Sequence, residues 1–214
     1  MKIIKSCFRS LIESSIKHLS STLGRKIRYK YYKNKFAHCG KNVRIDEGVI
    51  IEGAENMHIG DNVWIDKNVI LIAGKADVPE KFITNKSSFE NNEGCLYIGD
   101  NSHLGISTII QAHGIVRIEN HFTSSAGCKI YSLSNDVQKC HKGTHGSDDI
   151  YYIKSAITIE SNVWLGLSSV VLNGTIEKNS FVTPFTIIKN SFEANSIISG
   201  NPAKKIKDRF VNLI

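Results

Sequence analysis

Aliphatic residues return every six positions in three separate blocks of the chain. A period of six fits neither an α-helix, whose faces repeat every ~3.6 residues, nor a strand, whose faces alternate. It therefore predicts an internal structural repeat. The repeating positions are Ile59, Ile65 and Leu71 in the first block, Ile98, Leu104 and Ile110 in the second, and Ile159, Leu165 and Val171 in the third, which restarts out of step at Ile176, Val182 and Ile188.

The six-residue motifs that begin at these positions, called words below, also repeat. They read Ile59-Gly-Asp-Asn-Val-Trp64, Ile98-Gly-Asp-Asn-Ser-His103 and Ile159-Glu-Ser-Asn-Val-Trp164. An inward aliphatic followed by Gly, Asp or Asn suits short strands joined by tight corners, because these residues tolerate positive φ. Three such words complete one triangular coil, and the aliphatics of successive coils would stack into a core column. We therefore predict an all-β parallel β-helix rather than a β-sandwich, which would not keep one spacing in three places.

The composition suits one domain with an additional arm, since 41% of the residues are apolar and 22% are charged. We expect the domain to span residues 36–210, with a C-terminal tail from about residue 196. Polar stretches interrupt the repeat at residues 74–95 and 131–156, and a β-helix accommodates such insertions as loops extruded from a corner. The second loop, rich in Ser, Asp and His, is the better candidate for an active-site loop.

Residues 1–35 form a basic arm with ten Lys or Arg against the single acid Glu13, within a formal charge of +7 for the whole chain. The remaining domain is slightly acidic and gives no reason to expect nucleic-acid binding. Apolar residues of the arm recur at steps of three to four, which predicts an amphipathic helix. Residues 1–30 would pack on the domain or a neighbouring subunit, or lie on an anionic membrane surface. The apolar positions are Ile3, Ile4, Phe8, Leu11, Ile12, Ile16, Leu19 and Leu23.

The five cysteines are widely spaced and include no CxxC pair, so we expect neither a disulfide framework nor a zinc site. His141 and His145 stand four residues apart, but Gly143 between them disfavours the helix on which such a pair would bind a metal. Charged residues interrupt the apolar stretch at the N-terminus, which predicts neither a signal peptide nor a membrane span. We expect a cytoplasmic protein.

The C-terminal part of the chain resembles a known family. It runs from Ile159-Glu-Ser-Asn-Val-Trp-Leu-Gly166 through Val171-Leu-Asn-Gly174 to Ser196-Ile-Ile-Ser-Gly-Asn-Pro-Ala-Lys204. In order and spacing this is similar to the ending of the hexapeptide-repeat acyltransferases, especially the galactoside, maltose and polysaccharide O-acetyltransferases. The resemblance covers residues 38–210 and implies a left-handed β-helix, acetyl-CoA as the acyl donor, and a homotrimer with grooves between subunits. The segment after Leu172 is one residue shorter than is usual in the family.

The resemblance also implies which residues line the acetyl-CoA groove. Trp164 takes the place of a groove-lining tryptophan, Leu167 a place often held by a small polar residue, and Pro184 that of an alanine. Thr183 and Lys189 would lie on the same edge as these. Asn201 and Lys204 would approach the nucleotide end of the donor, with Lys204 near phosphate.

Acyl transfer to a hydroxyl requires a general base and hydrogen-bond donors for the tetrahedral oxyanion, and histidine is the natural base near neutral pH. In the family this histidine lies on the loop after the coil that here ends at Ser132. The corresponding position is Asn135, with Asp136 beside it, and neither replaces a histidine at pH 7 without a large pKa shift. We therefore expect Asn135 and Asp136 to contact the acceptor.

Three explanations for the missing base stay open. The loop is re-registered so that His145 or His141 reaches the site, His113 serves from the neighbouring coil, or the protein is catalytically impaired. We favour the first, because the two loop histidines flank a Gly hinge. Asp148 would then orient the imidazole and stabilise its charged form.

The sequence thus predicts an acetyl-CoA-dependent O-acetyltransferase that acts on a sugar hydroxyl of a bacterial surface polysaccharide, such as capsule or O-antigen, or its precursor. It would work as a homotrimer in the cytoplasm, or peripherally on the inner membrane, without a metal. Two alternatives remain. One is an N-acetyltransferase on an amino-sugar nucleotide, and the other is a non-catalytic β-helix scaffold, which Asn135 at the expected base position would suit.

Overall fold

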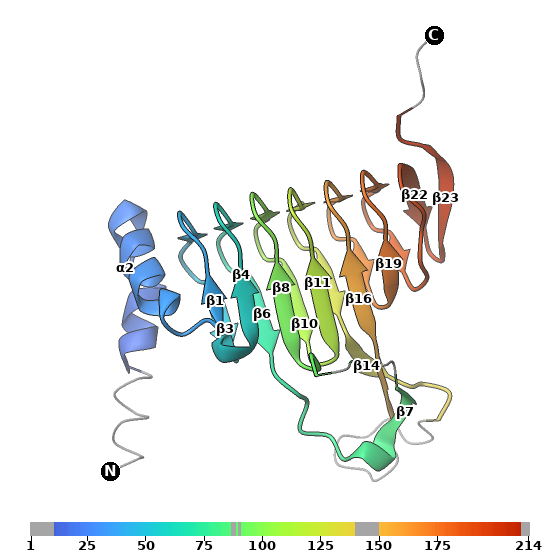
Figure 1. The fold of residues 1–214 in the computed structure, drawn as a ribbon, viewed down its shortest axis with the longest axis horizontal. Helices are drawn as coiled ribbons and strands as arrows, with labels where there is room; N and C mark the ends of the chain where they lie inside the picture. Colours follow the sequence, from blue (N-terminus) through green and yellow to red (C-terminus); the bar gives the residue numbers. More distant parts are fainter. Residues whose placement is uncertain (1–10, 87–88, 90, 140–149, 211–214) are drawn as a thin grey trace.

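The chain forms a parallel β-helix preceded by a helical arm (Figure 1). The computed structural model describes residues 11–86, 89, 91–139 and 150–210. Three sheets run along the prism, and each turn of the chain adds one short strand to each of them. The strands of one turn pair in parallel with those of the turns before and after.

The strands of each sheet follow in the order in which the coils stack. Sheet A contains β1 (His38–Cys39), β4 (Met57–Ile59), β8 (Cys95–Ile98), β11 (Ile115–Ile118), β16 (Ala156–Ile159) and β19 (Gly174–Ile176). Sheet B contains β2 (Arg44–Ile45), β5 (Trp64–Ile65), β9 (His103–Leu104), β12 (Thr123–Ser124), β17 (Trp164–Leu165), β20 (Phe181–Val182), β22 (Ser196–Gly200) and β23 (Ala203–Asp208). Sheet C contains β3 (Ile50–Glu52), β6 (Ile70–Ala73), β10 (Ile109–Ala112), β13 (Lys129–Tyr131), β18 (Val170–Val171) and β21 (Ile187–Ile188).

The repeating aliphatic residues form the core, as predicted. In sheet A, successive coils place Ile59, Ile98, Ile118 and Ile159 in register with one another. All four are at most 2% exposed. Because side chains alternate between the faces of a strand, each coil places one aliphatic inward at the same height. Burial of these columns removes a continuous apolar surface from water, which is the main stabilising contribution in such a fold.

Asparagine occupies the corners between sheets A and B. Asn62, Asn101 and Asn162 adopt φ values of 56°, 56° and 60°, in the left-handed region that Asn tolerates better than most residues. The Nδ2 of Asn62 donates to Oδ1 of Asn101 at 3.1 Å, so the corners are also joined from coil to coil. His121 takes the same position with φ 60°. His121 therefore fills a corner position that requires positive φ.

Both interruptions of the repeat leave the prism at the corner between sheets C and A. The first lies between β6 and β8 and contains η2 (Glu80–Phe82) and β7 (Ile83–Lys86). The second lies between β13 and β16 and contains β14 (Leu133–Asn135) and β15 (Tyr152–Lys154). The out-of-step restart after Val171 occurs at this corner too, where Gly174 adopts φ 92°. This corner is thus where the coils vary in length.

The two extrusions join into one small sheet, called sheet D, which hangs beside the prism (Figure 1). Strand β15 pairs antiparallel with β14 and in parallel with β7. An ion pair between Lys154 and Glu93 adds a second connection between the extrusions. Segments far apart in the sequence therefore build one structure at the variable corner.

The described part of the arm packs on the first coil. Residues 11–17 are helical and α2 spans Ser21–Lys33. The guanidinium of Arg28, in a residue only 1% exposed, donates to the carbonyl oxygens of Ile45, Ile16 and Leu19 at 2.8, 2.9 and 2.7 Å. The prediction of a single helix between residues 3 and 23 was wrong for the described residues, because the helix is interrupted at residues 18–20. There Gly24 lies so close to the Leu19 carbonyl that a Cβ would sit 1.9 Å from its oxygen.

The apolar stripe of the arm is only partly covered. Ile16 is buried, whereas Leu11, Leu19 and Leu23 are exposed. None of the described helices is long and apolar enough to cross a membrane. Contact of residues 1–30 with a neighbouring subunit or with the inner membrane stays a prediction.

Candidate active site

A hollow of about 580 Å³ lies where sheet D meets the corner between sheets C and A. Strand β14 and the turn after it bring Asn135 and Asp136 to this hollow, and β7 brings Thr84. Asn173 and Lys189 line it from the last two coils. The two residues predicted to contact an acceptor therefore share a cavity, and its lining of carboxylate, amide, hydroxyl and ammonium groups suits a hydrophilic ligand.

Asp136 is buried in this lining, with 8% of the residue exposed. Its Oδ1 accepts a hydrogen bond from the backbone N–H of Gln138 at 3.1 Å. Its own N–H donates to the Tyr151 carbonyl at 2.8 Å, which extends the pairing of β14 with β15 by one residue. The hydrogen bond from the Thr84 hydroxyl is the main cause that lowers the pKa of Asp136. The carboxylate is therefore ionised near pH 7 and is suited to accept hydrogen bonds rather than to act as a general base.

Two of the three candidate bases lie outside the described residues. His141 and His145, together with Asp148, belong to residues 140–149. The described residues on either side of this segment adjoin the hollow. Lys139 lines it, and the carbonyl of Tyr151 accepts the hydrogen bond from Asp136. The described residues that flank the two histidines in the sequence therefore lie at or next to the hollow.

The third candidate, His113, lies at the same corner in the coil between the two extrusions. Its Nδ1 donates to the carbonyl oxygen of Gly74 at 2.8 Å, at the base of the first extrusion. This bond leaves Nε2 as the nitrogen that can accept a proton. His113 is not among the residues that line the hollow. The His113 ring is thus held by the Gly74 carbonyl and lies outside the lining of the hollow.

The residues predicted for the donor lie on a different edge of the prism. Trp164 in β17 is 45% exposed, and its Nε1 donates to the hydroxyl of Ser125 at 3.1 Å. Leu167 and Pro184 are exposed at the corner between sheets B and C. Thr183 is held beside them by a hydrogen bond of 2.7 Å to the hydroxyl of Ser199. Trp164, Leu167, Thr183 and Pro184 thus share one open edge of the prism, called the donor edge below.

Three further residues, Lys189, Asn201 and Lys204, were also predicted to contact the donor. Lys189 does not lie on the edge with Thr183, contrary to our expectation, because β21 carries the chain across sheet C to the next corner, where Lys189 lines the hollow. Asn201 and Lys204 are exposed at the hairpin of β22 and β23. Lys205 is paired with Glu193 and Asp208, whereas Lys204 has no ion pair within the described part of the chain. The ammonium group of Lys204 is therefore more available to a phosphate than that of Lys205.

No protein-family model matches the chain. It is 26% identical over 186 residues, 84% of this chain and 85% of the relative, to a dTDP-4-amino-4,6-dideoxy-D-glucose acyltransferase of Escherichia coli. The fold of this chain is similar to that of AntD, an N-acyltransferase from Bacillus cereus in complex with dTDP and 3-hydroxybutyryl-CoA. The TM-score is 0.70 with 21% sequence identity, and the match covers 86% of this chain and 88% of AntD. This chain is an acyltransferase, and its repeat and fold are similar to those of the hexapeptide-repeat acyltransferases.

The acyltransferase also resembles a maltose O-acetyltransferase from Clostridium difficile, with a TM-score of 0.59 and 14% identity over 94% of this chain and 84% of that one. The predicted family and the predicted fold class, a left-handed parallel β-helix, are confirmed. The described residues contain no group of three or more His, Cys, Asp or Glu side chains placed to hold a metal.

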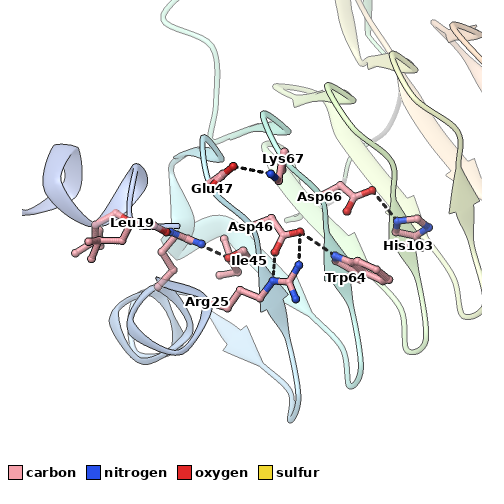
Figure 2. Close-up of polar contacts among 11 residues, drawn as sticks. Leu19, Arg25, Ile45, Asp46, Glu47, Trp64, Asp66, Lys67 and His103 are labelled. Carbon is pink, nitrogen blue, oxygen red and sulfur yellow. Dashed lines mark hydrogen bonds and ion pairs between the residues drawn. The ribbon is translucent and has the colours of Figure 1, made fainter. Parts of the chain in front are cut away.

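The first extrusion also contributes to the hollow of this acyltransferase, which its sequence did not lead us to expect. Thr84 of β7 lines the hollow together with Asp136, and its hydroxyl donates to the Tyr152 carbonyl at 3.3 Å, although the second extrusion was the favoured loop. The repeat could have indicated that the two extrusions lie side by side, because both interruptions follow the third six-residue motif of a coil and therefore leave from the same corner. His103 of β9 lies in sheet B, and its Nε2 is 3.0 Å from Oδ2 of Asp66 (Figure 2). It is not among the residues that line the hollow.

Proposed function

We propose that this acyltransferase moves an acyl group from acyl-CoA, with acetyl-CoA as the expected donor, to the amino group of a nucleotide-linked sugar. The observation that supports this acceptor is the ionised Asp136 in the hollow under sheet D, which can hold an amino or hydroxyl group by a charge-assisted hydrogen bond. The alignment with the E. coli enzyme over most of the chain favours the amino sugar.

O-acetylation of a sugar hydroxyl in a surface polysaccharide or its precursor is the second candidate. The C-terminal run that ends in Ser196-Ile-Ile-Ser-Gly-Asn-Pro-Ala-Lys204 and the fold similarity to the maltose O-acetyltransferase favour it. The polar hollow suits either nucleophile, because a carboxylate accepts hydrogen bonds from both amines and hydroxyls.

In the proposed reaction the acceptor nitrogen or oxygen attacks the thioester carbonyl. A histidine of residues 140–149 takes the acceptor proton, and the tetrahedral oxyanion collapses with cleavage of the carbon–sulfur bond. The proton then returns from the imidazolium to the CoA thiolate. An imidazole can perform both transfers near pH 7 because its unperturbed pKa is about 6.5.

The product distinguishes the two candidates. Purified protein is incubated with acetyl-CoA and either an amino-sugar nucleotide such as dTDP-4-amino-4,6-dideoxyglucose or a neutral oligosaccharide, and products are analysed by mass spectrometry before and after mild base. We expect a base-stable acetyl group on the amino sugar. A base-labile acetyl group on the oligosaccharide alone would favour the ester, and no transfer to any sugar would favour the scaffold alternative.

Substitution of Asp136 tests the acceptor site. We expect Asp136→Asn to raise the KM for the acceptor by about 10-fold or more and to leave the KM for acetyl-CoA unchanged, because a charge-assisted hydrogen bond is replaced by a weaker neutral one. Asp77→Asn, at an exposed position on the first extrusion, is the control. Equal acceptor KM values for both variants would contradict the assignment.

The donor edge and the hollow of one chain lie on different sides of sheet C, which supports a site completed by a second copy. The edge near Trp164 also exposes the apolar residues Ile106, Leu167 and Phe185, of which Phe185 is 69% exposed. Apolar side chains in such a row suit a subunit contact. We therefore propose that the donor edge of one copy faces the hollow of the next in a homotrimer.

Complementation tests this shared site. Asp136→Asn impairs the hollow and Trp164→Ala impairs the donor edge, so each variant alone should have low activity. Mixed assemblies from co-expression should recover part of the activity, because some interfaces combine an intact hollow with an intact donor edge. Mass measurement in solution should give a trimer. Monomeric protein, or mixtures no more active than the average of the two variants, would refute the shared site.

A further inference from the structure

A second hollow, of about 710 Å³, lies between α2 and the first two coils. Arg25 and Lys26 line it from α2, and Arg44 and Trp64 line it from β2 and β5. The described residues that line it include no Asp or Glu. This hollow is therefore rich in cations and hydrogen-bond donors, and it shares no lining residue with the hollow under sheet D.

The buried carboxylate of Asp46 fixes the position of Arg25 beside this hollow (Figure 2). Asp46 accepts two hydrogen bonds from the guanidinium, from Nε and from Nη2, the latter at 3.1 Å. Its Oδ2 also accepts a hydrogen bond from Nε1 of Trp64 at 3.2 Å. A guanidinium carries five N–H groups, so donors of Arg25 remain after the pair with Asp46 has formed.

A second guanidinium lies over the same aromatic ring. The Cζ of Arg44 is 5.3 Å from the centroid of the Trp64 ring, and the Cζ of Arg25 is 5.9 Å from it. Within the described part of the chain, neither Arg44 nor Lys26 forms an ion pair, so Asp46 balances only one of the three cations. Cation–π contacts hold the two guanidiniums in place, but they do not neutralise them.

We propose that this hollow binds the phosphate or diphosphate group of an organic ligand, with Arg25 and Arg44 as its main contacts. Arginine matches phosphate oxygens with paired N–H donors, and a dianion would offset the unbalanced positive charge. The wall is also preorganised, because Arg28 fastens α2 to the first coil through the carbonyl oxygen of Ile45. The phosphate belongs to a soluble nucleotide or to a lipid headgroup.

Binding is measured on the full chain without an acyl donor, so the result is independent of acyl transfer. The soluble probes are dTDP and inorganic pyrophosphate in calorimetric titrations at low salt. The membrane probe is a vesicle containing phosphatidylglycerol, in a sedimentation assay. Arg44→Ala is the test variant, because Arg44 is exposed and its loss leaves the core intact. Arg117→Ala is the matched control, since Arg117 also lies over an aromatic ring, that of Tyr97 at 4.3 Å, but on sheet A.

We expect Arg44→Ala to weaken binding of dTDP about 10-fold or more, and Arg117→Ala to leave it within about 2-fold, because a charge-assisted contact is lost only in the first. Binding of vesicles alone, lost in Arg44→Ala, would assign the phosphate to a lipid headgroup. Absence of binding to all three probes, or equal effects of the two substitutions, would overturn the proposal.

A fluorescence measurement places the ligand in this hollow. The chain contains two tryptophans, so Trp164→Phe leaves Trp64 as the single reporter. The binding probe should change its emission, because the guanidiniums over the ring reorient when they bind phosphate. The change should disappear in the Trp164→Phe, Arg44→Ala double variant. An unchanged emission at saturating probe would place the ligand elsewhere and refute this site.

Discussion

Replacement of both His141 and His145 by alanine should lower kcat by about 10²–10⁴-fold, the usual contribution of a general base. The described residues on either side of them in the sequence, Lys139 and Tyr151, lie at or next to the hollow that holds Asp136. Asp136 itself cannot take over the role, because its pKa is lowered rather than raised. The kcat/KM of the unchanged enzyme should fall below about pH 6.5 as the histidine becomes protonated, and the double variant should lose this dependence.

The single variants then assign the base, and we expect His145→Ala to show the larger loss. His38→Ala is the control, because His38 is exposed near the arm and far from the hollow in the coil order. Full activity of the double variant would refute the loop histidines. A loss in His113→Ala would in that case move the base to the neighbouring coil.

Arg28→Ala should lower the free energy of unfolding by about 3 kcal/mol, since each buried carbonyl oxygen left without the guanidinium donor costs about 1 kcal/mol or more. The substitution breaks three hydrogen bonds and leaves the carbonyl oxygens of Ile16, Leu19 and Ile45 without their donor. Burial of the guanidinium lowers the pKa of Arg28, because water no longer solvates its charge. Urea denaturation of the purified protein measures the change.

Lys30→Ala is the matched control for Arg28, because Lys30 is an exposed cation on the same helix. It should change the free energy of unfolding by no more than about 0.5 kcal/mol. Arg28→Lys should fall between the two, since an ammonium cannot reach three carbonyl oxygens in the geometry of a guanidinium. Identical urea midpoints for Arg28→Ala and Lys30→Ala would show that the arm is held by other contacts.

The amino-acid sequence by itself determined the β-helix. The six-residue period places one aliphatic of each repeat inward, and the asparagines at most corners between sheets A and B tolerate the positive φ that these corners need. Core positions such as Ile98 and Ile159 followed directly from this period. The extrusions could be located for the same reason, since a strict repeat makes every interruption visible.

Only the tertiary structure decided how the extrusions and the arm are used. The pairing of β7 with β15, which brings Thr84 to Asp136, joins residues almost seventy positions apart, and the polar sequences of the extrusions carry no period that specifies a partner. The same holds for the hollow beside α2, where Arg25 meets Asp46 and Trp64 only after the arm has packed on the first coil. Local periodicity specifies the coils because neighbouring residues determine it, whereas sites made by docking of irregular segments depend on contacts that the sequence pattern does not encode.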